Sequence, residues 1–245
     1  MLRLQIVFLA NKPQIYNNLC EQFTNIMPVR VPPKNYRSVT GLVASPKNKT
    51  MRVHESTLER DLLFLFEFDL NVATYEEQPV RIEFRDADGQ SHTYTPDVLV
   101  TYRKDIVPAK RMQSLLCEVK YRKDLFADWK RLKPKFKAAR SFAMERGWHF
   151  SILTEQEIRT PLLENARFLL SYQRLEMDWG QTQLLLQTIG ELREATAESL
   201  LLACCQERLE RACLLPMLWH LVSIGMIGAD LNRKLTMHSP IWTMG

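Results

Sequence analysis

The stretch that decides the fold is Ser114-Leu-Leu-Cys-Glu-Val-Lys-Tyr121. Alternate side chains of a β-strand point to opposite faces, and here Leu115, Cys117 and Val119 make one face wholly apolar. The other face carries Glu118 and Lys120. An ionised group inside an apolar strand is costly unless it is paired or binds a metal. The stretch therefore predicts a central strand that also carries chemistry.

The sequence before this strand predicts a helix and a hairpin. A helix is expected after Glu55, where Ser56 and Glu59 have the spacing of a capping box. Alternating apolar residues then predict two strands, 80–84 and 93–102, which a turn at residues 86–89 would join into a hairpin.

The sequence after it predicts a helical region and a further strand. The helical region runs from Asp124 to Arg146 and is expected to break or kink near Pro134. Gly147 ends it, and residues 148–153 predict a strand. A helix, mixed strands, a helix and a strand in this order are typical of an α/β domain around one sheet.

A second carboxylate completes the candidate site. Asp97 follows Pro96 within the expected strand 93–102, and the order Pro-Asp then Glu-x-Lys is typical of metal-dependent nucleases. Asp97 and Glu118 would bind Mg²⁺, which prefers oxygen ligands, together with the backbone carbonyl of Val119. Glu59 could complete a second metal position, so that two Mg²⁺ ions share the site, and Mn²⁺ could substitute.

The lysine of the motif has more than one candidate role. The metal would polarise the scissile phosphate and acidify a bound water. Lys120 would position or deprotonate that water, or neutralise charge on the phosphorus. The triplet Asp128-Trp-Lys130 also fits acid-x-Lys but lies in a helical pattern, and a surface Glu–Lys pair with a turn aspartate is the simpler alternative. Gln78 is expected at an ordinary strand position.

Charge divides the chain into unlike halves. Residues 1–154 contain 25 Lys and Arg against 17 Asp and Glu, a balance of +8, whereas residues 155–245 contain 8 against 11, a balance of −3. Such asymmetry indicates different tasks, and a basic half indicates a polyanionic partner. We therefore expect a boundary between a catalytic domain (28–154) and a C-terminal domain (155–245). The prolines and basic residues that begin at Met27 read as an extended arm, which predicts that residues 1–27 are an N-terminal extension.

Basic residues are dense downstream of Lys120. Between residues 122 and 140 there are 8 Lys and Arg against Asp124 and Asp128. A solvated helix face is the ordinary interpretation, but this density favours contacts with DNA phosphates, which fix position without reading sequence. The residues predicted to contact DNA are Lys123, Lys130, Arg131, Lys133, Lys135 and Lys137.

The C-terminal half predicts a winged helix-turn-helix domain. Its pattern gives a short β ribbon from Ile227 to Leu235 and helices near 161–172, 181–194, 196–207 and 208–224. Pro216 is expected to begin its own short helix, ended by Gly225. This candidate recognition helix offers only His220 and Ser223, whereas helices that read DNA use several polar and basic side chains. Docking to protein is therefore favoured over DNA reading.

Several functional classes lack their signatures. No G-x-x-x-x-G-K-[ST] or G-x-G-x-x-G motif supports ATP or dinucleotide binding, and the 5 histidines show no ligand spacing. The 5 cysteines form no C-x-x-C pair, which fits reduced thiols in a cytoplasm. No apolar run approaches the roughly 20 residues of a membrane helix, so no membrane association is expected.

In combination the motifs resemble the TnsA-type endonucleases of Tn-seven-like transposons. The resemblance covers about residues 28–245. The motifs that carry it are Ser56-Thr-Leu-Glu-Arg-Asp61, Phe66-Glu-Phe-Asp69, Glu77-Gln-Pro79, Tyr94-Thr-Pro-Asp97, Glu118-Val-Lys-Tyr121, Thr154-Glu-Gln-Glu-Ile-Arg159 and Asp230-Leu231.

The resemblance implies a restriction-endonuclease-like, PD-(D/E)xK core that cuts the 5′ ends of a transposon, the strands not joined to the target. The catalytic residues that it implies are Glu59, Asp97, Glu118 and Lys120. It further implies a DDE transposase, TnsB, that cuts and joins the 3′ ends, and an AAA+ regulator, TnsC, which we expect at the C-terminal domain. A stand-alone restriction or junction nuclease of the same fold and a non-catalytic DNA-binding module are the alternatives.

Overall fold

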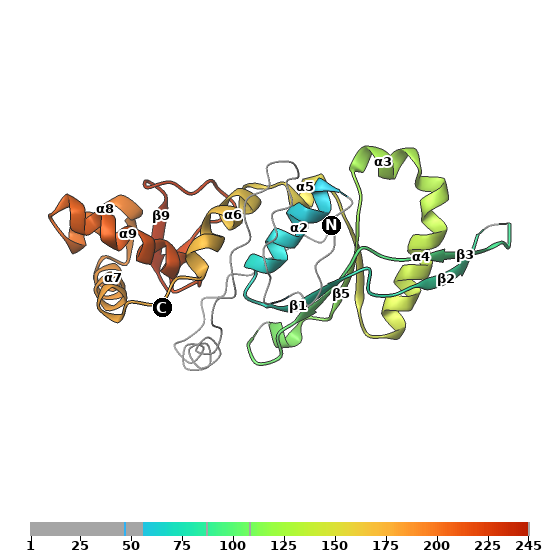
Figure 1. Cartoon of the computed structure of the whole chain (residues 1–245), viewed down its shortest axis with the longest axis horizontal. Helices are drawn as coiled ribbons and strands as arrows, with labels where there is room; N and C mark the ends of the chain where they lie inside the picture. Colours follow the sequence, from blue (N-terminus) through green and yellow to red (C-terminus); the bar gives the residue numbers. More distant parts are fainter. Residues whose placement is uncertain (1–46, 48–55, 87, 108, 245) are drawn as a thin grey trace, which may run out of the picture.

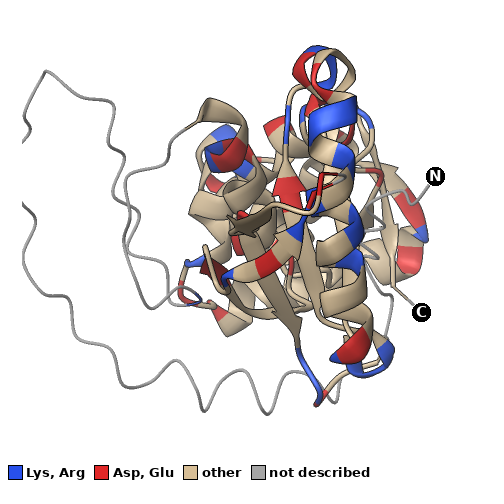
Figure 2. Ribbon diagram, turned by 90° about the vertical axis from the view of Figure 1, so that its right-hand side faces the viewer, with Lys and Arg blue, Asp and Glu red and all other residues tan. Residues whose placement is uncertain are grey.

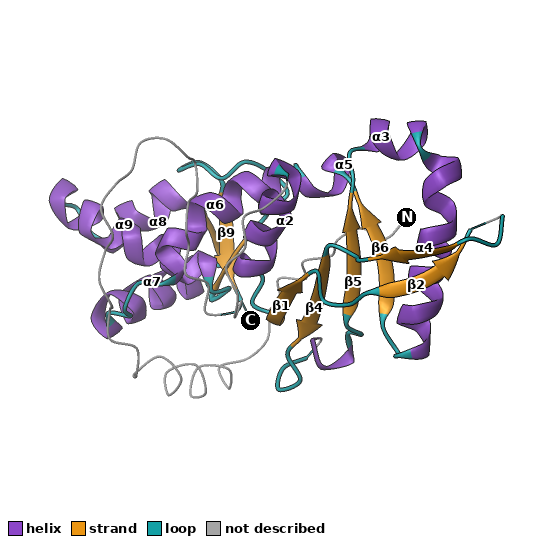
Figure 3. Cartoon of the chain, turned by 45° about the vertical axis from the view of Figure 1, so that its right-hand side comes forward, coloured by secondary structure: helices purple, strands orange, loops and turns teal. Residues whose placement is uncertain are grey.

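The computed structural model of the chain describes residue 47 and residues 56–86, 88–107 and 109–244. Its centre is a four-stranded sheet in the order β1-β4-β5-β6 (Figures 1 and 3). The strands are β1 (Val72–Glu77), β4 (Val98–Tyr102), β5 (Leu115–Val119) and β6 (His149–Leu153). β4 is antiparallel to β1 and to β5, whereas β5 and β6 are parallel. The expected N-terminal extension, residues 1–27, lies outside the described residues.

The central strand confirms the predicted division of its side chains. Cys117 and Val119 belong to the larger apolar core, while Leu116 belongs to a second cluster on the opposite face. Glu118, on that opposite face, is also buried, with 2% of its surface exposed. A short 3₁₀ helix (Ala109–Arg111) lies between β4 and β5.

The predicted hairpin exists but is shorter than expected. β2 (Ile82–Arg85) pairs antiparallel with β3 (Ser91–Tyr94) in a separate two-stranded sheet. The prediction of a single strand over residues 93–102 was wrong, because the chain leaves the hairpin at Thr95–Asp97 and continues as β4 in the main sheet. Pro96 has no N–H to donate to a strand ladder, so the division falls where it stands.

Two helices connect β5 to β6. α3 (Arg122–Ala127) and α4 (Trp129–Glu145) are separated at Asp128, and α4 continues through Pro134, so a break of the helix at Pro134 was wrong. A proline within a helix removes one backbone hydrogen bond. Here Leu132 and Phe136, on either side of it, are buried in the second apolar cluster with β6, and this packing holds α4 together. Gly147, with a φ of +67°, ends the helix as predicted.

The other face of the sheet is covered by α2 (Thr57–Phe68). Ser56 is its N-cap, and the backbone N–H of Glu59 donates to Ser56 Oγ at 3.1 Å, which confirms the predicted cap. At the other end of α2, Lys47 Nζ donates to the backbone carbonyls of Phe66, Glu67 and Asp69. These carbonyls have no partner within the helix, so Lys47 satisfies its C-terminal end.

One apolar core continues from the sheet into the C-terminal half. α5 (Glu155–Ile158) and α6 (Pro161–Gln173) follow β6, and α6 packs against both α2 and α9. The same buried cluster includes Phe66 on α2, Cys117 on β5 and Leu169 on α6. The apolar core therefore extends across the expected domain boundary at residue 154.

Three helices and a small sheet complete the chain. These elements are α7 (Trp179–Leu192), β7 (Glu194–Thr196), α8 (Ala197–Cys204), α9 (Arg208–Ser223), β8 (Ile227–Ala229) and β9 (Pro240–Thr243). β9 lies between β7 and β8 and is antiparallel to both. Gly225 ends α9 with a φ of +77°, as predicted, but Pro216 lies inside α9 and starts no helix of its own.

The predicted ribbon from Ile227 to Leu235 was half right. β8 forms its first strand, but its partner β9 comes later in the chain. The reason lies in the intervening segment, where the side chain of Asn165 on α6 holds the backbone. Its Nδ2 donates to the carbonyls of Leu231 and Arg233, and its Oδ1 accepts from Leu235 N. Within the described ranges, no helix is long and apolar enough to cross a membrane.

Candidate active site

Asp97 and Glu118 lie on neighbouring strands at one end of the sheet. Asp97 stands just before β4, and its backbone N–H donates to the Cys117 carbonyl on β5 at 3.0 Å. Val119 N donates to Asp97 Oδ2 at 2.6 Å. The antiparallel register of β4 and β5 therefore brings the Pro-Asp and Glu-x-Lys motifs to the same place (Figure 3).

The electrostatics of Asp97 bring all four predicted catalytic residues together. Burial, and after it the charge of Glu118, raise the pKa of the Asp97 carboxyl to about 7. Glu59 also raises this pKa, whereas the hydrogen bond from Val119 N and the charge of Lys120 lower it. The charges of Glu59, Glu118 and Lys120 thus all influence the ionisation of Asp97.

Two side chains from outside β5 form hydrogen bonds with the Glu118 carboxylate. Tyr94 Oη donates to Glu118 Oε2 at 2.6 Å, and Lys135 Nζ on α4 donates to Oε1 at 2.8 Å. Lys120 Nζ is farther away, 3.8 Å from Oε1. A buried carboxylate is tolerated when its oxygens are bonded and its charge is balanced, and both conditions are met here.

The basic residues predicted to contact DNA separate into two groups. Lys135 is directed into the site: its Nζ lies 4.5 Å from the centre of the Tyr94 ring, and 18% of its side chain is exposed. The others are exposed, and basic segments recur along the long helix that faces the viewer in Figure 2. The exposed group consists of Lys123, Lys130, Arg131, Lys133 and Lys137.

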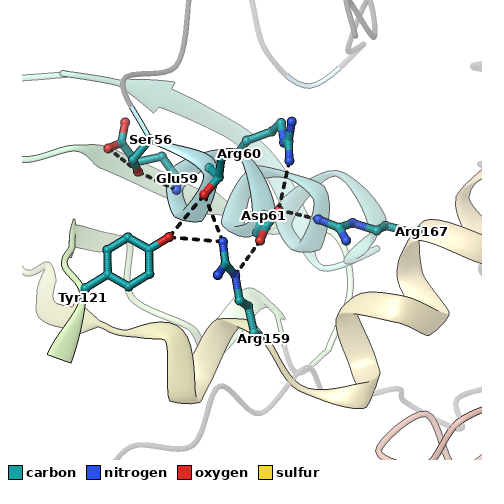
Figure 4. Close-up of polar contacts among 8 residues, drawn as sticks. Ser56, Glu59, Arg60, Asp61, Tyr121, Arg159 and Arg167 are labelled. Carbon is teal, nitrogen blue, oxygen red and sulfur yellow. Dashed lines mark hydrogen bonds and ion pairs between the residues drawn. The ribbon is translucent and has the colours of Figure 1, made fainter. Parts of the chain in front are cut away.

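Glu59 projects from the first turn of α2 and is oriented by its own N-cap. Ser56 Oγ donates to Glu59 Oε1 at 2.8 Å (Figure 4). Gln78, expected at a regular strand position, instead follows β1 with a left-handed φ of +49°. Its backbone N–H donates to the Asp97 carbonyl at 2.8 Å, so this unusual conformation supports the segment that carries Asp97.

The donors of this site suit a hard cation but are not preassembled around one. Carboxylate oxygens are the ligands that Mg²⁺ prefers. In the part of the chain that the structure describes, no three Asp, Glu, His or Cys side chains are gathered as ligands of one ion. For Glu118 to join Asp97 as a ligand, its Oε1 would exchange the ammonium of Lys135 for the ion. One positive charge would replace another, so the residues fit a divalent cation chemically.

Sequence reasoning missed the contribution of Tyr94 and the direction of Lys135. Tyr94 belongs to the Tyr94-Thr-Pro-Asp97 motif, but nothing in the spacing shows that its hydroxyl meets a residue 24 positions later. Lys135 has the same sequence signature as the exposed lysines around it. Only the packing of α4 against β2 and β6 distinguishes it.

Comparison with known proteins identifies the class and then the family. A family model described as the N-terminal part of TnsA-like endonucleases matches residues 69–155, and one described as the C-terminal part of TnsA endonucleases matches residues 157–231. With carboxylates and a lysine at the end of a mixed sheet, these matches make the protein a nuclease. The chain belongs to the TnsA endonuclease family. No curated protein matches it.

Proposed function

We propose that the chain is a Mg²⁺-dependent DNA endonuclease that cuts the 5′, non-transferred strands at transposon ends. It hydrolyses a phosphodiester and leaves a 5′-phosphate and a 3′-hydroxyl, and it acts with the DDE transposase TnsB during cut-and-paste transposition. The observation that carries the proposal is the pair of hydrogen bonds that join Asp97 to the strand of Glu118, from Val119 N to Asp97 Oδ2 and from Asp97 N to the Cys117 carbonyl. Membership of the TnsA family supports the transposition context.

The chain's own residues divide the work by burial. Glu118 is enclosed, whereas 38% of the Lys120 side chain is exposed, so Lys120 is the group able to reach a phosphate or the attacking water. Asp97, Glu118 and Glu59, with the Val119 carbonyl, would hold Mg²⁺ or Mn²⁺. The bound cation would polarise the phosphate and supply an acidified water. A PD-(D/E)xK core of the restriction-endonuclease type accounts for this arrangement of residues.

The C-terminal half has the element order of a winged helix. A helix, a strand, two helices and two strands follow one another from α7 to β9, with β9 between β7 and β8. In α9 the two polar side chains of the candidate recognition segment are buried: His220 Nδ1 donates to the Tyr172 carbonyl, and Ser223 Oγ donates to the His220 carbonyl. Because neither is available to read bases, this half docks protein, and TnsC is the proposed partner.

The test is strand-specific cleavage by the purified chain with its partner transposase and a transposon-end duplex. Asp97→Ala and Lys120→Ala should each abolish cutting of the 5′ strand and leave 3′-strand cutting by the partner intact. Asp105→Ala is the matched control, because Asp105 is an exposed carboxylate paired with Arg103 beyond the other end of β4. Unchanged 5′ cleavage in either active-site variant would overturn the proposal.

Two other results would point to the alternatives. Specific cutting by the chain without any partner would favour a stand-alone nuclease of the same fold. DNA binding without metal-dependent cutting in any combination would favour a non-catalytic module. Mg²⁺ dependence is tested by removing divalent ions with EDTA and restoring them singly.

A further inference from the structure

A buried carboxylate near the active site is surrounded by three arginines. Asp61 on α2 has 3% of its surface exposed. Arg159 Nε donates to its Oδ2 at 2.8 Å, Arg167 on α6 donates to its Oδ1, and Arg60 lies 3.9 Å from the same Oδ1 (Figure 4). The Asp61 carboxylate thus pairs with three guanidinium groups, and the charge of Arg159 also acts on Glu155, so the positive groups still outnumber the carboxylates.

The arginines are accessible, and their donors are not all used. The side chains of Arg159 and Arg167 are each 41% exposed, and that of Arg60 is 36% exposed. In the hydrogen bonds among the described residues, Arg159 uses its Nε and one terminal nitrogen, and Arg167 uses one terminal nitrogen. A guanidinium has five N–H donors in a planar fork that matches phosphate oxygens. Asp61 therefore orients guanidinium groups that still have N–H donors available for a ligand.

The cluster contacts residues that adjoin the candidate active site. Arg159 also donates from its terminal nitrogen to Thr57 Oγ1 at 3.0 Å and to Tyr121 Oη at 3.2 Å. Tyr121 follows Lys120 in the chain, and Thr57 lies in the same helical turn as Glu59. A ligand at the arginines would therefore lie beside the scissile group, on the side of α2 and α6.

We propose that Arg60, Arg159 and Arg167 form a binding site for one phosphate of the DNA backbone, on the strand that is cut. This inference rests on the proposed endonuclease function and adds a second DNA contact, separate from the basic face of α3 and α4. Asp61 acts as a positioning residue that holds the arginines apart and oriented. A phosphate is the favoured ligand because exposed guanidinium groups beside a nuclease site lie where the phosphates of a DNA substrate would pass.

The experiment measures the salt dependence of DNA binding by the full chain without divalent metal. The probe is a fluorescein-labelled 30-base-pair duplex of random sequence, because a phosphate contact does not depend on sequence. The double variant Arg159→Gln/Arg167→Gln should bind about tenfold more weakly at low salt. Its slope of log K against log salt should be shallower by about 1, the value for one lost phosphate contact.

The matched control is Arg174→Gln. Arg174 follows α6, is 49% exposed and pairs with buried Glu67 at the other end of α2, so it reproduces the type of ion pair away from the site. Its slope should equal that of the natural chain. If the arginines only tie α2 to α6, the double variant will lower the unfolding temperature and leave the slope unchanged, which would overturn the proposal.

The outcomes separate this inference from the proposed function. A natural chain that does not bind the duplex even at 20 mM salt would overturn the phosphate site. Cleavage of the 5′ strand combined with an unchanged slope would overturn the phosphate site alone. If the slope of log K against log salt is shallower in the double variant but the natural chain never cuts DNA, the nuclease proposal fails and the phosphate site is still supported.

Discussion

Lys135 Nζ lies 2.8 Å from Glu118 Oε1, whereas Lys120, the lysine of the Glu-x-Lys motif, lies 3.8 Å from the same atom. The nearest cation to the buried carboxylate therefore comes from α4 and not from its own strand. Lys135 is thus the closer partner of the Glu118 charge, whereas the Lys120 side chain is the more exposed of the two. The two lysines therefore differ in their position relative to Glu118.

Replacing Lys135 should destabilise the fold. Lys135→Met removes the closest partner of a buried charge, and we expect a loss of about 2–3 kcal/mol in the free energy of unfolding, since Lys120 compensates only in part. Urea denaturation measures this loss. Lys137→Met, at an exposed position two residues away, should change stability by less than about 0.5 kcal/mol. Equal effects in the two variants would show that the ion pair with Glu118 contributes nothing.

The hydroxyl of Tyr94 should matter more than that of another buried tyrosine. Tyr94→Phe leaves Glu118 Oε2 without its donor, at a cost of about 1–3 kcal/mol in unfolding free energy. Tyr102 on β4 is also buried, but no described residue bonds its hydroxyl, so Tyr102→Phe should cost less than about 0.5 kcal/mol. Chemical denaturation of the two variants compares them directly. A larger loss in Tyr102→Phe would contradict the assigned contact.

Asp97 should make the stability of the metal-free chain fall as the pH rises. Its pKa is raised to about 7 from 3.8, mainly by burial and then by Glu118, so between these values the folded chain binds more protons than the unfolded chain. Asp97→Asn keeps a hydrogen-bond acceptor and cannot ionise. It should therefore stabilise the chain relative to the natural sequence, by about 2 kcal/mol more at pH 8 than at pH 5.

The measurement is urea denaturation in EDTA at both pH values. If Asp97→Asn differs in stability from the natural chain by the same amount at pH 5 and pH 8, the pKa of the Asp97 carboxyl is not raised in the folded chain. Asp105→Asn provides the comparison, because hydrogen bonding to Arg103 lowers the pKa of that exposed carboxyl.

Two glycines of the C-terminal half should respond to alanine in opposite directions. A Cβ at Gly228 on β8 would lie 2.1 Å from Nε1 of Trp242 on β9, so Gly228→Ala must displace the indole and should cost about 1–3 kcal/mol. Gly190 in α7 has open space around it, and Gly190→Ala should stabilise by about 0.5–1 kcal/mol through helix propensity. Thermal unfolding distinguishes a fall from a rise, and a stable Gly228→Ala variant would contradict the close contact.

Local signals predicted the elements whose ends and faces are set by nearby residues. The Ser56 cap, the opposite faces of Cys117 and Glu118, and the glycine at the end of α9 each depend on a few adjacent positions. β1 was not predicted, because Val72-Ala-Thr-Tyr-Glu-Glu77 has no clean alternation. It is a strand through its pairing with β4.

Contacts between distant segments account for the rest. Pro134 and Pro216 read as helix breakers, yet buried neighbours on both sides keep α4 and α9 continuous. The Pro-Asp and Glu-x-Lys motifs could be recognised in the sequence because each is a local pattern of adjacent residues. Lys135 and the pair of Asp61 with Arg159, which are 98 residues apart, have no local signature at all. Their roles appear only when helices and strands are packed together.

Phe66 and Leu169 belong to one buried core that both halves of the chain share, and this limits how the protein can be divided or recombined. A fragment ending at Thr154 would leave the apolar face of α2 without α6 and should be prone to aggregate. Exchange of the C-terminal half between relatives would succeed only when the incoming α6 complements the resident α2. The two halves of the chain are therefore constrained to evolve as a matched pair.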